Sequence, residues 1–293
     1  MQKFNDNSKV CFLGDSITSA GIWIAKIFEY YKNSGITARF YNLGVAGNTA
    51  SLELEHLERE PFLKDATDVV IMFGMNDIKR ENYRDGINET INRAAVEASK
   101  KALETMVNIL VNQGKNIVLC SSTPHAEDKN VNAALSEISA KMKELAGNKG
   151  VSYIDFHKVF SDVSDRIKLI SDDMMHPDMV GNAVLANVFL SLQGFSDVYT
   201  GEDAAEWEKQ AHFEMSSTNM LRFKAEAALR SIEFVKRVVL PSCKGDETAY
   251  LDEYYKSCDA FFRKQINVYK RAHKDETELF AELEKYTEEV HNK

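Results

Sequence analysis

Short apolar runs alternate with longer amphipathic stretches over the first two-thirds of the chain. The runs are rich in aliphatic and β-branched residues, and they cover residues 10–13, 38–43, 68–73, 116–120 and 151–154. Polar and apolar residues do not alternate strictly within them, which is typical of strands that are buried on both faces of a sheet. The pattern therefore predicts five parallel strands.

The stretches between the runs carry apolar residues three or four positions apart, as Met106, Ile109 and Leu110 illustrate. This spacing predicts helices over residues 20–33, 49–60, 86–113, 131–147 and 179–193. Strands that alternate with helices of this length are joined by crossover connections, which place helices on both faces of the sheet. We therefore expect an α/β fold, a three-layer α/β/α sandwich with a five-stranded parallel sheet.

The residues beyond Gly194 have a different character, because no further β-branched run appears. Apolar residues recur at helical spacing over residues 204–240 and again from residue 247 to the end, and residues 241–245 separate the two stretches. This pattern predicts a domain over residues 1–198 and a C-terminal helical extension, a hairpin, over residues 199–293. Its aromatic stripe is more typical of packing than of ligand binding, either on the parent domain or on a second copy in a homo-oligomer.

Composition narrows the choice of partner and of compartment. Lys and Arg number 36 and Asp and Glu number 45, and the resulting net charge of -9 disfavours binding to a nucleic-acid backbone. The polar N-terminal residues lead into only a short apolar run, which predicts neither a signal peptide nor a membrane span and favours a cytoplasmic location. The four cysteines are scattered without a C-x-x-C pair, so we expect buried free thiols.

Three polar motifs follow the first three predicted strands. Gly-Asp-Ser-Ile-Thr at residues 14–18 contains Ser16, residues 42–49 contain Gly44 and Gly47, and Gly-Met-Asn-Asp at residues 74–77 contains Asn76. Ligands of open parallel sheets bind at the carboxyl ends of the strands, where these motifs lie. Taken singly, each has a simpler interpretation: the serine as a helix N-cap and the other two as turns.

A fourth motif, Asp-Met-Met-His at residues 173–176, precedes the last predicted helix of the domain. A carboxylate three residues before a histidine can hold the imidazole Nδ1 and leave Nε2 free as a base, although a lone histidine is more often structural. The four motifs lie at the ends of different core elements, and together they supply the residue types that acyl transfer requires. Their coincidence predicts an active site.

With these four motifs in this order, residues 8–193 resemble the SGNH (GDSL-like) hydrolase superfamily of esterases and acylhydrolases. The resemblance implies a flavodoxin-like fold and a catalytic triad of Ser16, Asp173 and His176. It also implies an oxyanion hole made by the backbone N–H groups of Ser16 and Gly47 and by the side chain of Asn76. The first motif reads Ser-Ile where the family often has Ser-Leu, which leaves the nucleophile untouched.

Two of these assignments have an alternative in the same motif. Gly44 could replace Gly47, which we prefer because the family's glycine usually precedes Asp or Asn and then Thr. Asp172 could replace Asp173. His157, near the end of the fifth strand, is interpreted as structural because no serine motif accompanies it. The chemistry requires no metal or other cofactor, and the remaining histidines form no recognisable ligand pair.

The expected function is the hydrolysis of small acyl esters, in particular O-acetyl groups on a carbohydrate. The charged stretch after Asn76 should border the site, and it offers Arg80 and Tyr83 as substrate-binding residues, with a solvated loop as an equally good interpretation. Trp23 is interpreted as a core residue rather than a sugar-stacking ring. The alternatives are a lipase or thioesterase for longer acyl chains, and a noncatalytic binding module that oligomerises through the C-terminal helices.

Overall fold

The computed structural model describes residues 1–60, 62–79, 91–163 and 167–211, together with Phe223 and Ala227. Five parallel strands form one sheet in the order β2-β1-β3-β4-β5. They are β1 (Lys9–Gly14), β2 (Arg39–Asn42), β3 (Asp68–Phe73), β4 (Asn116–Ser121) and β5 (Ser152–Ile154). Each predicted strand is confirmed to within one residue at either end.

Helices alternate with the strands along the chain. They are α1 (Ser16–Ser19), α2 (Ile22–Asn33), α3 (Ala50–His56) with a 3₁₀ turn at Leu57–Arg59, α4 (Met75–Lys79), α5 (Arg93–Asn112), α6 (Lys129–Lys149), α7 (Phe156–Val163), α8 (Met179–Leu192) and α9 (Ala204–Ala211). The prediction of a turn at residues 74–77 is corrected to the short helix α4. Helix α5 begins later than predicted, because the side chain of Asn92 caps it by accepting from the N–H groups of Ala94 and Ala95.

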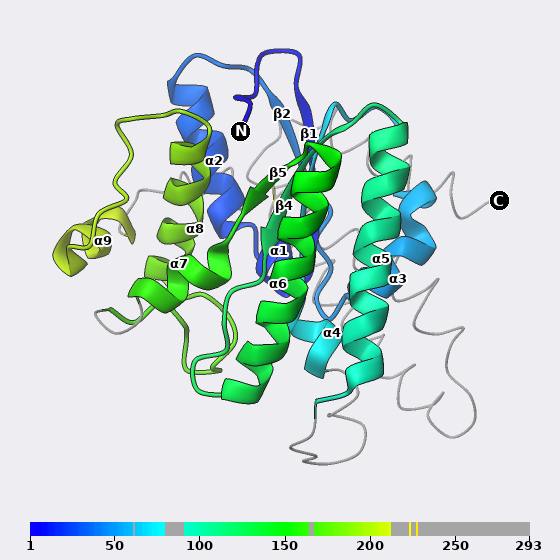
Figure 1. The fold of residues 1–293 in the computed structure, drawn as a ribbon. Helices are drawn as coiled ribbons and strands as arrows, with labels where there is room; N and C mark the ends of the chain where they lie inside the picture. The colour runs from blue at the N-terminus through cyan, green and yellow to red at the C-terminus, as the bar shows by residue number, and fades with distance from the viewer. Residues whose placement is uncertain (61, 80–90, 164–166, 212–222, 224–226, 228–293) are drawn as a thin grey trace, which may run out of the picture.

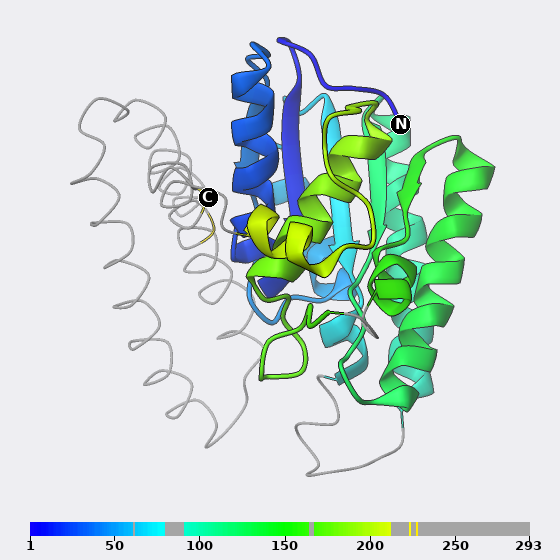
Figure 2. The same cartoon turned by 90° about the vertical axis from the view of Figure 1, so that its left-hand side faces the viewer.

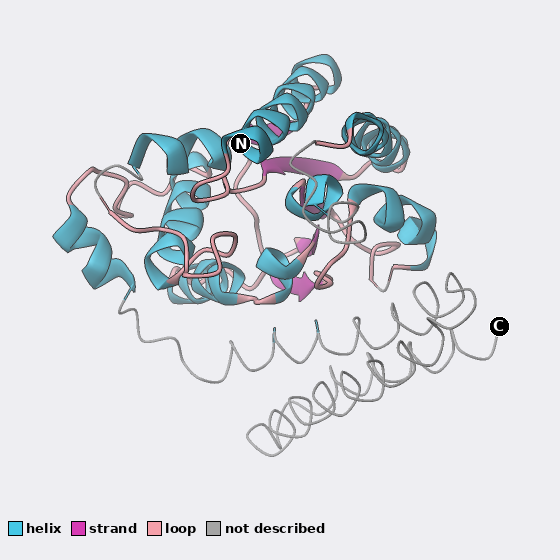
Figure 3. Ribbon diagram, turned by 90° about the horizontal axis from the view of Figure 1, so that it is seen from below, coloured by secondary structure: helices cyan, strands magenta, loops and turns pink. Residues whose placement is uncertain are grey.

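Two hydrophobic cores lie on opposite faces of the sheet. Figures 1 and 3 show the helices that cover these faces. Successive side chains of a strand point to opposite faces, so Phe12 packs in the core beneath α2, α7 and α8, whereas Leu13 packs in the core beneath α3, α5 and α6. Both side chains are almost fully buried. The predicted three-layer sandwich is therefore confirmed.

Trp23 on α2 lies inside the first core. Its side chain is fully buried, and its ring meets those of Phe12, Phe156 and Phe189 edge to face at centroid distances of 5.4–6.1 Å. Aromatic pairs with this geometry stabilise a core beyond their buried area. Trp23 is thus a packing residue, and it has no exposed face on which a sugar could stack.

The first residues of the C-terminal extension pack on the sandwich. Helix α9 lies against α8, and Figure 2 shows both helices in front of the sheet. The Trp207 side chain is buried, and its indole N–H donates to the Gly201 carbonyl at 3.0 Å. Phe223 is also buried, with its ring 5.6 Å from that of Phe28 on α2.

The rest of the predicted hairpin lies outside the described residues, and the homo-oligomer stays a prediction. Cys11 and Cys120 are buried and form no disulfide, as expected. Cys243 and Cys258 also lie outside the described residues. Over the part of the chain that the structure describes, no helix combines the length and the apolar character needed to cross a membrane.

Candidate active site

Ser16 is the first residue of α1, directly after the carboxyl end of β1. The residue that caps this helix is Asp15, whose Oδ1 accepts from the Ile17 N–H at 3.0 Å. The alternative interpretation of Ser16 as the N-cap is therefore wrong. The Ser16 hydroxyl instead lies 2.7 Å from Nε2 of His176, which is 160 positions later in the sequence. This contact joins the first strand to the segment before α8.

His176 belongs to a loop, residues 171–176, that we call the histidine loop. Its two ends are joined by a hydrogen bond from the Ser171 N–H to the His176 carbonyl at 2.8 Å. Asp173 Oδ2 lies 2.5 Å from His176 Nδ1. The other carboxylate oxygen, Oδ1, accepts from the N–H groups of Met175 and His176 and from the Ser171 hydroxyl, at 2.8–2.9 Å. The loop thus fixes both the carboxylate and the imidazole.

These hydrogen bonds control the charge of Asp173. Its partial burial alone would raise the pKa, but the donors from His176, Met175 and Ser171 outweigh that effect and hold the pKa well below its usual range. Asp173 is therefore ionised at neutral pH. The alternative residue, Asp172, forms an ion pair with Lys168 on the exposed surface instead of contacting His176.

The charge of Asp173 determines what the imidazole can do. An ionised carboxylate only accepts hydrogen bonds, so the ring proton lies on Nδ1 of His176. Nε2 is then left to accept the proton of the Ser16 hydroxyl at 2.7 Å. This arrangement can remove the proton from Ser16 and create a nucleophile.

The two candidate glycines have different surroundings. Gly44 is buried, its N–H donates to Asn42 Oδ1 at 3.0 Å, and a Cβ atom there would lie 2.3 Å from the Ser19 nitrogen. The Gly44 N–H therefore already has an acceptor. The absence of a side chain at Gly44 lets the end of β2 approach α1 closely. Gly47 is exposed and has φ of 76°, in a turn closed by the Asn48 N–H and the Val45 carbonyl. This geometry supports Gly47 as the candidate.

Asn76 lies at the start of α4, after β3, and is half-buried. Its Nδ2 donates to the Asn48 carbonyl at 3.1 Å, which joins the segment after β3 to the segment after β2. Both strands neighbour β1, the strand that leads to Ser16. The structure thus brings the Ser16, Gly47 and Asn76 segments to one edge of the sheet.

Two carboxyl groups that the sequence analysis did not single out are buried next to this edge. Burial raises the pKa of Asp15 to about 7, against the hydrogen bond from Ile17, and the charge of Asp77 raises it further. Burial raises the pKa of Asp77 to about 6, against hydrogen bonds that include one from the Ala50 N–H at 3.0 Å. Both residues belong to the motifs of Ser16 and Asn76, but sequence alone does not show their burial.

The remaining candidates lie elsewhere. Arg80 and Tyr83 fall outside the described residues, so their role in substrate binding stays a prediction. His157 lies in α7, where its backbone N–H donates to the Ser121 hydroxyl at 2.9 Å, and burial lowers the pKa of its ring. The helix itself was not predicted, because eight residues are too short for a clear periodic pattern.

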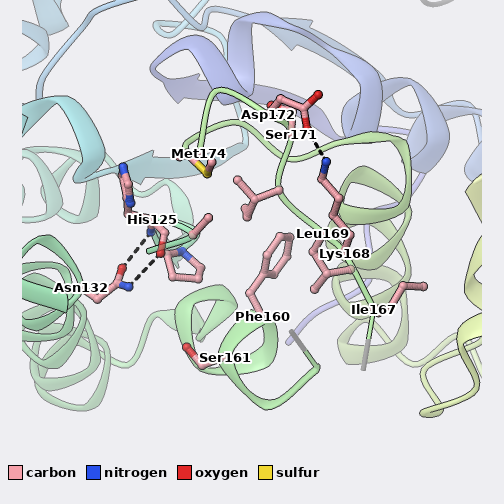
Figure 4. A pocket seen from close by; sticks show the side chains of 13 residues that line it. His125, Asn132, Phe160, Ser161, Ile167, Lys168, Leu169, Ser171, Asp172 and Met174 are labelled. Carbon is pink, nitrogen blue, oxygen red and sulfur yellow. Dashed lines mark hydrogen bonds and ion pairs between the residues drawn. The ribbon is translucent and has the colours of Figure 1, made fainter. Parts of the chain in front are cut away.

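A cavity of about 570 Å³ lies beside the histidine loop (Figure 4). Its lining includes the apolar side chains of Phe160 and Leu169, with Lys168 and Asp172 paired at one side. Ser16 is not among the lining residues. The cavity therefore adjoins the segment that carries the base without enclosing the nucleophile.

Comparison with known proteins agrees with this fold. The sequence model of the GDSL-like lipase/acylhydrolase family matches residues 12–184, more than half of the chain. The chain therefore belongs to the GDSL-like lipase/acylhydrolase family. Its members are defined as acylhydrolases, and the protein is accordingly a carboxylic ester hydrolase. The alternative of a noncatalytic binding module is not supported.

Individual relatives are more distant. An acetylxylan esterase of Geobacillus stearothermophilus is 24% identical over 219 residues, which cover 66% of this chain and 97% of that protein. A crystal structure of an acetylxylan esterase from the same organism has a TM-score of 0.60 and 20% identity, covering 68% of this chain and all of the other. A gut microbial diltiazem-metabolizing enzyme has a TM-score of 0.70 and 16% identity, covering 98% of this chain and 96% of the other. These two structures show that the fold is shared.

Proposed function

We propose that the protein is a serine esterase that removes small acyl groups, in particular O-acetyl groups on a carbohydrate. Ser16 is the nucleophile, His176 the base and Asp173 the residue that orients it. The observation that carries the proposal is the continuous contact from the Ser16 hydroxyl to His176 Nε2 at 2.7 Å, and from His176 Nδ1 to Asp173 at 2.5 Å.

The reaction begins when Ser16 Oγ attacks the ester carbonyl carbon while its proton moves to Nε2 of His176. The tetrahedral intermediate collapses as the imidazolium gives this proton to the departing alcohol oxygen, which leaves the acyl group on Ser16. A water molecule then attacks the acyl-enzyme, again with His176 taking the proton. The acid departs and the Ser16 hydroxyl is restored.

The negative oxygen of each tetrahedral intermediate requires donors that are already in place. The backbone N–H groups of Ser16 and Gly47 and the Nδ2 group of Asn76 are the donors we propose. The Asn76 Nδ2 group has two N–H donors, and one of them donates a hydrogen bond to the Asn48 carbonyl oxygen, with 3.1 Å between nitrogen and oxygen. The second proton remains for the oxyanion.

The acetyl preference rests on the acetylxylan esterase relative, whose match covers nearly all of that protein and two-thirds of this chain. A second candidate substrate is diltiazem, because the match to the diltiazem-metabolizing enzyme extends over 98% of this chain. Acetylated xylooligosaccharides test the first of these two substrates, and diltiazem itself tests the second. Longer acyl chains form the third arm of the substrate test.

The nucleophile is tested by Ser16→Ala with p-nitrophenyl acetate as substrate. We expect turnover to fall to the background rate, whereas Ser19→Ala in the same short helix should keep it within about twofold, because its hydroxyl is outside the proposed mechanism. Thermal unfolding followed by circular dichroism checks that both variants fold. Unchanged turnover by Ser16→Ala would exclude the proposed mechanism.

The substrate is tested by a panel of acetylated xylooligosaccharides, diltiazem and p-nitrophenyl esters of increasing chain length. We expect the highest kcat/KM on acetyl esters and a decline as the chain grows. A maximum on esters of long, fatty acyl chains would favour the lipase or thioesterase alternative. Ser16→Ala is the control for each substrate.

A further inference from the structure

A fully buried carboxylate lies next to the proposed oxyanion hole and has no part in the mechanism above. Glu53 on α3 is 0% exposed, and its Oε2 accepts from the Nδ2 group of Asn48 at 2.7 Å. Asn48 is also 0% exposed. Moving a carboxylate from water into the interior is costly even when it is hydrogen-bonded. We therefore ask what the buried position of Glu53 contributes to the site.

The place of this pair along the chain is informative. Thr49 is the N-cap of α3, so Asn48 is the residue before the cap and Glu53 is the fourth helical residue. In many helices an apolar pair at these two positions fixes the direction in which the chain enters the helix. An apolar pair would serve α3 without burying polar groups. Unlike an apolar pair, Asn48 and Glu53 are joined by a hydrogen bond, which fixes the direction of the Asn48 side chain.

The hydrogen bond between Glu53 and Asn48 holds Asn48, whose backbone carbonyl accepts a hydrogen bond from the Asn76 side chain. The side chain of Asn48 is held by Glu53 through Nδ2, and its Oδ1 accepts from the Thr49 N–H at 2.9 Å. The Asn48 carbonyl then accepts from Asn76 Nδ2 at 3.1 Å. The terminal torsion of an asparagine is broad and its two ends are nearly isosteric, so an external contact must decide whether Nδ2 or Oδ1 faces the oxyanion.

We propose that Glu53 is a positioning residue for ester hydrolysis, acting through Asn48 to hold the Asn76 amide with its nitrogen toward the oxyanion. The inference rests on the proposed function, because it requires Asn76 to be an oxyanion donor. Glu53 itself touches neither the substrate nor the reacting atoms. The effect that we propose is on the orientation of the Asn76 amide.

The test compares Glu53→Met, Glu53→Gln and Asn76→Ala with p-nitrophenyl acetate. Methionine fills a similar volume without an acceptor for Asn48, so we expect kcat to fall about 10- to 100-fold with KM within about twofold, since misplacing a donor costs less than removing it. Glutamine keeps an acceptor oxygen, and Glu53→Gln should retain kcat within about threefold. Glu55→Ala, at an exposed position of the same helix, is the control.

A double mutant separates this role from a general stabilising role. If Glu53 acts through Asn76, adding Glu53→Met to Asn76→Ala should lower kcat by less than about threefold further. An equal loss in both backgrounds, or a loss of melting temperature with kcat unchanged in Glu53→Met, would overturn the proposal.

Should Glu53→Met fail to fold, Asn48→Ala breaks the same link and keeps the backbone carbonyl. We expect the same selective loss of kcat, and wild-type kcat in Asn48→Ala would overturn the proposal. The proposed function is tested separately: if Ser16→Ala keeps its turnover, that function fails. If Ser16→Ala is inactive and Glu53→Met is unaffected, only the positioning role fails.

Discussion

The two sides of the nucleophile are built in different ways. The histidine loop is partly open to solvent, with side-chain exposures of 39% for His176 and 46% for Asp173. The opposite side, which we call the amide side, consists of Asn48, Glu53 and Asp77 behind Asn76, and these three side chains are at most 6% exposed. The histidine loop contacts Ser16 directly, through His176.

The histidine loop and the amide side shift the pKa values of their carboxyl groups in opposite directions. In the histidine loop, several close donors outweigh partial burial and depress the pKa of Asp173. On the amide side, burial dominates and raises the pKa of Asp77 to about 6. Close hydrogen bonds thus hold the pKa of a carboxyl group near the surface low, whereas the hydrogen bonds to Asp77 do not offset the effect of its burial.

The largest effect should come from removing the charge of the histidine loop with Asp173→Asn. The new amide NH₂ would face Nδ1 of His176, which would move the ring proton to Nε2 and remove the base. We expect kcat on p-nitrophenyl acetate to fall by about 10⁴, the size of the corresponding loss in serine proteases. Asp172→Asn is the matched control and should keep kcat within about twofold, because that carboxylate faces Lys168 on the surface. An equal fall in kcat in both variants would contradict the assignment of Asp173 as the residue that orients His176.

A smaller effect concerns the stability of the amide side. The pKa of Asp77 rises from 3.8 to about 6 on folding, so between these values the unfolded chain has lost the proton and the folded chain still binds it. The contribution of Asp77 to the free energy of unfolding should therefore fall as pH rises through this window, by on the order of 3 kcal/mol for a shift of this size.

This pH dependence is checked by urea unfolding of the wild type and Asp77→Asn at several pH values across and above this window. The substitution removes the titrating group, and it also removes the charge that raises the pKa of Asp15. We expect the variant to lose stability less steeply as pH rises. Parallel curves for the two proteins would show that Asp77 does not titrate in this window.

The smallest effect should follow Ser171→Ala in the histidine loop. This change removes one of the three donors to Asp173 Oδ1, and the two backbone N–H groups remain. A single bond to a charged acceptor contributes about 1.5 kcal/mol, so we expect kcat to fall by roughly tenfold or less. Ser161→Ala is the control, because its hydroxyl donates to the His157 carbonyl on α7 instead. A loss as large as that of Asp173→Asn would contradict a shared role of the three donors.

Sequence alone predicts much of the fold because the buried strands are continuous apolar runs. Residues 68–73 are predicted to the residue, and the strand order agrees with the flavodoxin-like fold that the family resemblance implies. The histidine loop is also visible in the sequence, since Asp173 and His176 are three residues apart and interact locally. Helix α7 was missed because its core contacts come from only two buried side chains, Phe156 and Phe160.

The amide side is harder to predict, since its contacts join segments far apart in the chain. The Asn76 to Asn48 bond spans 28 positions, and a buried Glu53 has the same appearance in a sequence as a solvated helical glutamate. Recognising Thr49 as an N-cap would have paired Asn48 with Glu53 through the positions that flank it. The choice of Asp15 over Ser16 as the cap likewise required the backbone geometry.

The burial of Trp207 and Phe223 has a consequence for the evolution of this chain. Both residues lie beyond the family match at residues 12–184, and yet both complete the packing over α2 and α8. In a homologue that lacked them, the half-buried Phe28 ring would lose its edge-to-face contact with Phe223. We therefore expect homologues without the segment to carry other residues on and around those two helices. Gly21, where an added methyl group would lie only 3.0 Å from the Phe223 side chain, is the position where such a change should be sought first.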